Sequence, residues 1–111
     1  MANRIRWHAR FAGTFLLWVE EVDPLPESGR PWLGCLHVRP PAGPFCPRYE
    51  ARDEHSAKQD VENTLRNTFS GYARRFDAYV HDHLKDELWT ACNYSAEEWQ
   101  QQRDHFIKTG D

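Results

Sequence analysis

The sequence predicts an α+β domain: an antiparallel sheet of three or four strands, packed on one face by a long or broken helix and followed by a C-terminal helix. Two observations carry this prediction. Apolar and polar residues alternate from residue 4 to 11, which is the period of a strand. From residue 53 onward, apolar residues recur every three or four positions, as in a helix. Strands followed by helices in 111 residues are typical of a single domain, 1–111.

The opening segment, 4–11, divides into an apolar set and a basic set of side chains. The apolar set, which we expect to face the core, is Ile5, Trp7, Ala9 and Phe11. The basic set, on the opposite face, is Arg4, Arg6, His8 and Arg10. With the core on one side, the basic face is expected to be open to water or to an anionic partner. Guanidinium groups bind carboxylates and phosphates through paired hydrogen bonds, so this face is a candidate binding surface.

Three further strands are expected before residue 53. Segment 15–22 is almost continuously apolar, which indicates a strand that is central in the sheet or covered on both sides. Segment 32–38 is the third strand, bounded by stretches rich in proline and glycine. Segment 45–52 supplies a short fourth strand, and Pro47 favours an edge position because proline has no N–H to pair.

A long apolar stripe predicts helix from residue 56 to 89. Asp53 or Ser56 can cap its start, and residues 56–59 fit a capping box. One unbroken helix would be about 50 Å long at roughly 1.5 Å per residue. A domain of this size has a diameter of roughly 34 Å, so the helix would overhang the sheet. We therefore expect a break at Ser70-Gly71, since glycine costs ~1 kcal/mol in a helix interior.

A C-terminal helix is expected over 95–108. Residues 95–98 form a second capping box, and Gly110 follows the last apolar residues. The core of the domain is expected to contain Trp7, Phe11, Leu17, Leu36, Val61, Leu65 and Phe69.

Charge and cysteine content limit the function and the compartment. The net charge is −3, but residues 1–52 carry seven Arg against five acids and residues 53–111 carry seven Lys or Arg against twelve acids. This balance argues against a general nucleic-acid coat and suits docking on another protein. Three cysteines without a framework spacing, no apolar stretch of membrane-spanning length and no secretory signal predict a reduced, cytoplasmic location and no membrane association.

Motifs for catalysis, cofactors and metals are absent from the sequence. There is no Gly-x-Ser-x-Gly, no glycine-rich phosphate loop and no His-Glu-x-x-His. Cys35, His37 and Cys46 lack the second close pair that zinc sites use, so the thiols are interpreted as buried small hydrophobic groups. We therefore expect no enzyme activity, no cofactor and no metal.

Arg75 and His81 have the Arg-x5-His spacing that resembles HEPN-type ribonucleases. In that family an Arg and a His on a helix line an RNA-cleaving cleft between two protomers, within an all-helical fold. The resemblance covers seven residues, and Phe76 stands where the family prefers a polar residue. It implies a ribonuclease as a minor alternative function.

Acidic residues form a second candidate surface near the end of the long helical region. They are Asp77, Asp82, Asp86 and Glu87, followed by Glu97 and Glu98. Trp89 and Tyr94 lie between the two groups. Aromatic rings rimmed by charged groups are typical of protein interfaces.

These observations predict a small cytosolic protein-binding module that inhibits or antagonises another protein or complex. Bacterial and phage proteins of this size class include anti-CRISPR, immunity and antitoxin-like proteins. The alternative is a nucleic-acid-binding module that uses the basic face of the first strand. A monomer is favoured over a homodimer, because a break at Ser70-Gly71 lets the distal helical part fold back onto the core.

Overall fold

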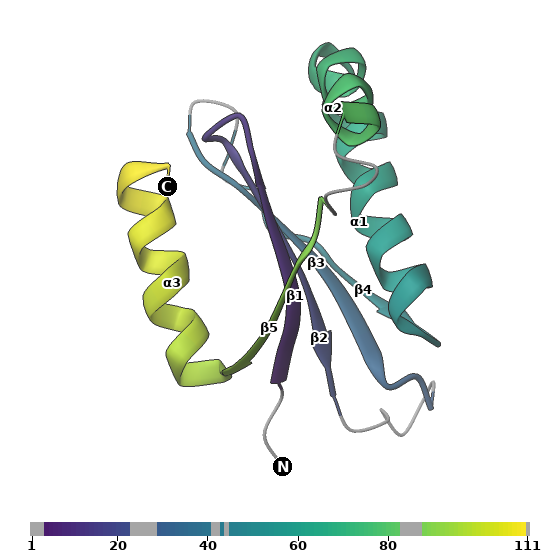
Figure 1. Ribbon diagram of the computed structural model, residues 1–111, viewed down its shortest axis with the longest axis vertical. Helices are drawn as coiled ribbons and strands as arrows, with labels where there is room; N and C mark the ends of the chain where they lie inside the picture. The colour runs from purple at the N-terminus through teal and green to yellow at the C-terminus, as the bar shows by residue number, and fades with distance from the viewer. Residues whose placement is uncertain (1–3, 23–28, 41–42, 44, 83–87, 111) are drawn as a thin grey trace.

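Five antiparallel strands form one sheet with helices on both of its faces (Figure 1). The structure is a computed structural model that describes residues 4–22, 29–40, 43, 45–82 and 88–110. The strands are β1 (Arg4–Phe11), β2 (Phe15–Glu21), β3 (Trp32–Val38), β4 (Arg48–Ala51) and β5 (Thr90–Ser95), in the order β4-β3-β2-β1-β5. The helices are α1 (Glu54–Thr68), α2 (Ser70–Asp82) and α3 (Ala96–Thr109). The predicted α+β class, the antiparallel sheet and the C-terminal helix are confirmed.

β2 is the central strand, as its continuous apolar run predicts. A tight turn joins it to β1, with Ala12 and Gly13 both at positive φ, 58° and 62°. Two successive left-handed residues match the twist of a hairpin. Residues 15–19 are all fully buried, because α1 and α2 cover one face of β2 while α3 covers the other. β4, which follows Pro47, is an edge strand as expected.

The predicted long helix is broken. α1 ends at Thr68, Phe69 leaves the helical conformation, and α2 begins at Ser70, one residue before the expected glycine. The break lets α2 pack back on the sheet, where Phe76 is fully buried with its ring centre 5.2 Å from that of Phe11.

The helix ends show which capping signals operate. Asp53 caps α1 by accepting a hydrogen bond from the Ser56 backbone N–H at 2.8 Å, so the alternative box starting at Ser56 does not form. Ser95 and Glu98 form the predicted capping box of α3. Gly110 ends α3 at a φ of 80°, a conformation that glycine adopts without steric cost.

α3 packs on the face of the sheet that was expected to be open. Together with that face it buries a second core made of Ile5, Leu16, Trp18, Cys35, Trp99 and Phe106. The larger core, under α1 and α2, holds the predicted residues Phe11, Leu17, Leu36, Val61 and Leu65, with Trp7 and Phe69 partly buried against it. The expectation of a solvent-facing basic strand surface is therefore wrong.

β5 is the strand that the sequence did not predict. It pairs antiparallel with β1, and a register shift lies between Ile5 and Trp7. Such a bulge moves a side chain to the other face of the sheet, so Ile5 joins the α3 core while Trp7 packs under α1. Alternation alone placed both on one face, and this placement is wrong for Ile5.

Candidate functional site

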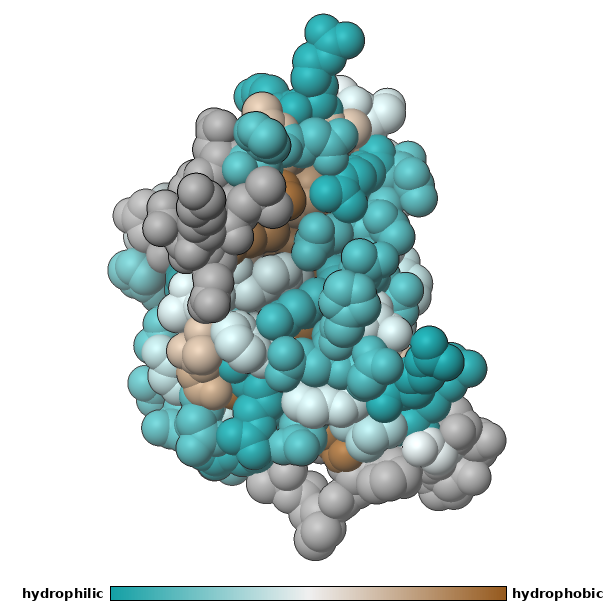
Figure 2. All heavy atoms as spheres, turned by 45° about the vertical axis from the view of Figure 1, so that its right-hand side comes forward, coloured by the Kyte–Doolittle hydropathy of each residue, from teal (hydrophilic) through white to brown (hydrophobic). Residues whose placement is uncertain are grey.

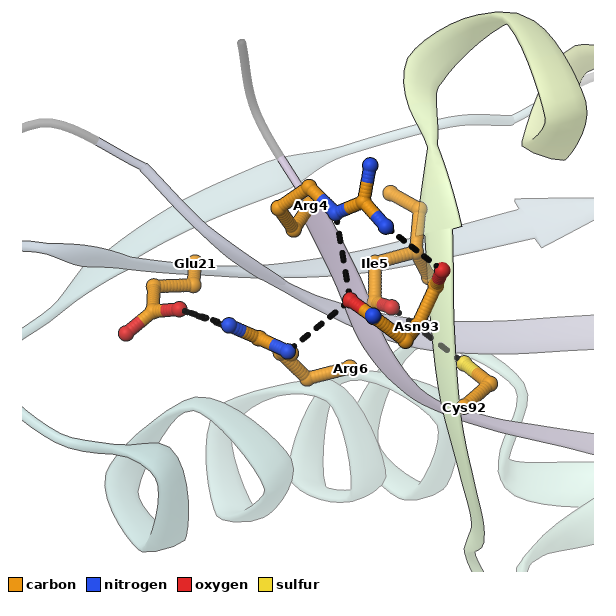
Figure 3. A network of polar contacts seen from close by, with 6 residues as sticks. All are labelled: Arg4, Ile5, Arg6, Glu21, Cys92 and Asn93. Carbon is orange, nitrogen blue, oxygen red and sulfur yellow. Dashed lines mark hydrogen bonds and ion pairs between the residues drawn. The ribbon is translucent and has the colours of Figure 1, made fainter.

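Arg4 and Arg6 are half-exposed, and both bond to neighbouring strands (Figure 3). Both donate to the side-chain oxygen of Asn93 on β5, at 3.1 Å and 2.9 Å, and Arg4 also donates to the Asn93 carbonyl at 2.8 Å. Arg6 donates through two nitrogens to one carboxylate oxygen of Glu21, at 3.0 Å and 2.7 Å. This network joins the ends of β2, β1 and β5.

His8 and Arg10 lie on the α3 side of β1. The His8 ring centre is 5.5 Å from that of Trp99 and 6.2 Å from that of Tyr94. Burial, and secondarily the charge of Arg10, lower the pKa of His8 to about 4, so this ring is neutral at pH 7. The four basic residues of the opening segment therefore do not form one cationic surface.

The structure also separates the residues of the predicted acidic surface. Asp77 accepts a hydrogen bond from Arg66 at 2.6 Å, and the Glu98 carboxylate caps α3. Trp89 belongs to the core under α1, whereas Tyr94 packs against the core under α3, so these two rings lie on opposite faces of the sheet. Asp86, Glu87 and the side chain of Asp82 lie outside the described residues.

Trp7 and Trp89 line a small hollow of about 250 Å³ beside α1. The ammonium group of Lys58 lies 3.6 Å from the centre of the Trp7 ring and 3.3 Å from a carboxylate oxygen of Glu54. The indole of Trp89 donates to Glu62 at 3.0 Å. Because the protein's own lysine occupies the aromatic faces, this hollow is not a free cation site.

Thiols and potential metal ligands are also dispersed. Cys35 is fully buried, as expected for a small hydrophobic group, and burial raises the pKa of its thiol above the usual value. Cys46 is exposed and Cys92 half-buried. Within the described part of the chain, no three His, Cys, Asp or Glu side chains gather as a metal site.

A hollow larger than the one beside Trp7 and Trp89 lies between the edge strand β4 and helix α1. It has a volume of about 560 Å³ and is open to solvent. β4 forms one side and the polar face of α1 forms the other. Its lining residues are Arg30, Arg48, Tyr49, Glu50, Asp60, Asn63, Thr64 and Asn67. A smaller hollow of about 250 Å³ adjoins it, sharing Arg30, Glu50 and Asp60. We call the two together the β4–α1 groove; the α1 side of the molecule is largely hydrophilic (Figure 2).

The backbone of β4 offers hydrogen-bonding groups along this groove. The N–H of Leu36 donates to the carbonyl of Pro47 at 3.2 Å, and the antiparallel register continues with Gly34 opposite Tyr49. Backbone groups point alternately to the two sides of a strand, so residues 47, 49 and 51 face β3 whereas Arg48 and Glu50 face outward. Among the described strands, none pairs with this outer edge.

Arg48 and Glu50 were not among the residues singled out from the sequence. The sequence did contain a signal for them, because alternate positions of the expected edge strand carry opposite charges: Arg48, Glu50 and Arg52. The facing wall of α1 could not be anticipated, because residues 60–67 are adjacent to β4 only in the folded chain.

Comparisons with known proteins assign no family. No family model, no curated protein and no solved structure matches this chain. None of the described helices combines the length and apolar character needed to cross a membrane.

Proposed function

We propose that the chain is a small protein-binding module that captures an extended segment of a partner protein at the outer edge of β4. The observation that carries this proposal is the outer edge of β4, which pairs with none of the described strands and lies beside an open groove whose other side is α1. In this mode of recognition, main-chain hydrogen bonds supply affinity and the side chains along the groove supply specificity.

Inhibition or antagonism is the role that we propose for this capture. A segment held as an added strand has its backbone groups engaged, so it is withdrawn from other contacts of the partner. The β4–α1 groove is polar and contains both cations and acids, including Arg48, Glu50 and Asp60. Mixed charge of this kind favours a peptide over a polyanion.

The alternative of nucleic-acid binding depended on an open face with four basic side chains. Arg4 and Arg6 are engaged with Asn93 and Glu21, and His8 is neutral at pH 7.

The minor ribonuclease alternative depended on Arg75 and His81. Both are exposed on α2, six residues or about 120° apart around the helix, in a fold that is not all-helical. We therefore propose the β4–α1 groove as the binding surface.

The test uses a proline at position 50. Glu50→Pro removes an N–H that points away from β3, so the sheet keeps its ladder while strand addition loses a donor. Glu50→Ala keeps the N–H and is the matched control. We expect tagged wild type and Glu50→Ala to co-purify a stoichiometric partner from the native host, and Glu50→Pro to lose it at unchanged circular dichroism.

Arg48→Pro provides a second variant in case Glu50→Pro does not fold, because the Arg48 N–H also points outward. Recovery of the same partner with a folded proline variant would overturn strand addition at β4. Absence of any stoichiometric partner for the wild type, across several salt concentrations, would overturn the proposed function as a whole.

A further inference from the structure

We infer that the segment bound at β4 carries a basic residue followed, two positions later, by an acidic one. This inference rests on the proposed function and adds the chemistry of the partner. It follows from the two outward-facing residues of β4, Arg48 and Glu50, and from the direction in which a strand is added to this sheet.

The charges of Arg48 and Glu50 are available to a partner. Both residues are exposed, and neither side chain forms a hydrogen bond or ion pair with another residue that the structure describes. By contrast, Arg6 pairs with Glu21 and Arg66 with Asp77. An added strand would place its side chains about 5 Å from those of Arg48 and Glu50, where opposite charges stabilise and like charges destabilise.

Strand direction determines the order of the two charges. All neighbouring strands of the sheet are antiparallel, and antiparallel pairing is the more stable per residue. In an antiparallel addition, the residue opposite Glu50 precedes the residue opposite Arg48 by two positions. The bound segment therefore reads basic-x-acidic, whereas a parallel addition would require acidic-x-basic.

The residue between the two charges faces α1. It lies opposite Tyr49, whose partner on β3 is Gly34, and Gly34 is in contact with α1. The α1 wall of the groove there is polar and includes Asn63 and Thr64. A threonine suits this position, because it combines a β-branched side chain for the strand with a hydroxyl for the polar wall. The central motif is thus Lys-Thr-Glu.

Three synthetic nine-residue peptides with identical neutral flanks test this motif. Their centres are Lys-Thr-Glu, Glu-Thr-Lys and Gln-Thr-Gln. Isotope-labelled protein is titrated with each peptide to millimolar concentration, while NMR follows the backbone amides of Arg48 and Glu50 and their hydrogen exchange. We expect both amides to become protected, with Lys-Thr-Glu binding about tenfold more tightly than Glu-Thr-Lys. The preference should weaken as salt is added, because both pairs are exposed.

A double charge reversal provides the matched variant. Arg48→Glu combined with Glu50→Arg keeps the backbone edge and exchanges the two charges, so the preference should invert to Glu-Thr-Lys. If this variant still preferred Lys-Thr-Glu, residues other than Arg48 and Glu50 would determine the peptide preference. That result would overturn the assignment to these two residues.

The remaining outcomes separate the charge pattern from the proposed function. Equal affinity of the three peptides with protected amides would overturn the charge pattern and leave strand addition standing. Tighter binding of Glu-Thr-Lys to the wild type would overturn the antiparallel order. If no peptide protects the amides of Arg48 and Glu50, strand addition at β4 is overturned as well.

Discussion

His8 and Arg10 are neighbours on the α3 face of β1, where the guanidinium of Arg10 lies 3.2 Å from Nδ1 of His8. Burial withdraws the imidazole from water, and the charge of Arg10 adds to the cost of protonating it. A side chain that would carry charge in mildly acidic solution is therefore neutral in the folded protein. Its contact with Trp99 makes it part of the packing between β1 and α3.

This environment predicts a loss of stability in acid. The pKa of His8 falls from 6.5 to about 4 on folding, so as the pH falls through this window the unfolded chain binds the proton first. The contribution of His8 is therefore fully present above pH 6.5 and decreases towards pH 4. We expect the free energy of unfolding, measured with urea across this window, to fall more steeply for the wild type than for His8→Phe.

His8→Phe is the suitable control because it retains a ring against Trp99 and cannot titrate. The pKa of His37 is also lowered, by burial and by Arg103, and this contribution is common to both proteins. Parallel pH profiles for the two proteins would contradict the prediction.

At the scale of elements, α1 approaches β3 closely at one glycine. A Cβ added at Gly34 would lie 2.5 Å from the carbonyl oxygen of Ala57 and 2.7 Å from a methyl group of Val61. The backbone of Gly34 needs no positive φ, so the constraint is the space between strand and helix. The same contact positions the α1 wall of the β4–α1 groove.

Gly34→Ala is expected to destabilise the protein by about 1–3 kcal/mol, because the backbone of α1 must move to admit the methyl group. Gly71→Ala is the matched control: nothing lies within 4 Å of an added Cβ there, and alanine favours helix by up to ~1 kcal/mol. Urea unfolding of both variants measures the difference. A Gly34→Ala variant as stable as Gly71→Ala would show that α1 can shift freely on the sheet.

At the scale of the whole molecule, helices on both faces of the sheet cover the apolar residues. A dimer through the distal helical region would need Phe76, Tyr79, Val80 and Trp89 to be uncovered. Phe76 and Trp89 are buried, and Tyr79 and Val80 pack against the same core. Among the described residues, Ile107 is the one large apolar side chain that is exposed, at 38%. The monomer favoured from the sequence stays a prediction, and the burial of these side chains is the reason we retain it.

We therefore expect light scattering to give the mass of one chain, 13.1 kDa. Phe76→Glu should unfold the protein, because it places an unpaired charge in the core. Ile107→Glu should leave both mass and stability unchanged. A wild-type dimer that Phe76→Glu converts into a folded monomer would contradict the prediction. Leu84, which also belongs to the apolar stripe, lies outside the described residues.

Local periodicity in the sequence was sufficient for most of the fold. The apolar run of β2 indicated a central strand, Pro47 indicated an edge, and Ser95 with Glu98 marked the start of α3. These signals depend on residues that are neighbours in the chain, so they can be recognised without the tertiary structure. β5 gave no such signal, because its half-exposed residues have neither an apolar run nor a clear alternation.

Only the tertiary structure decided which surfaces are available to a partner. Placing α3 on the second face of the sheet partly buried His8 against Trp99, and pairing with β5 engaged Arg4 and Arg6. The β4–α1 groove likewise exists only because residues 48–50 of β4 lie beside residues 60–67 of α1 in the folded chain. Whether a charged residue is solvated, paired or free to bind depends on such non-local neighbours, whereas strand and helix periods are properties of the chain itself.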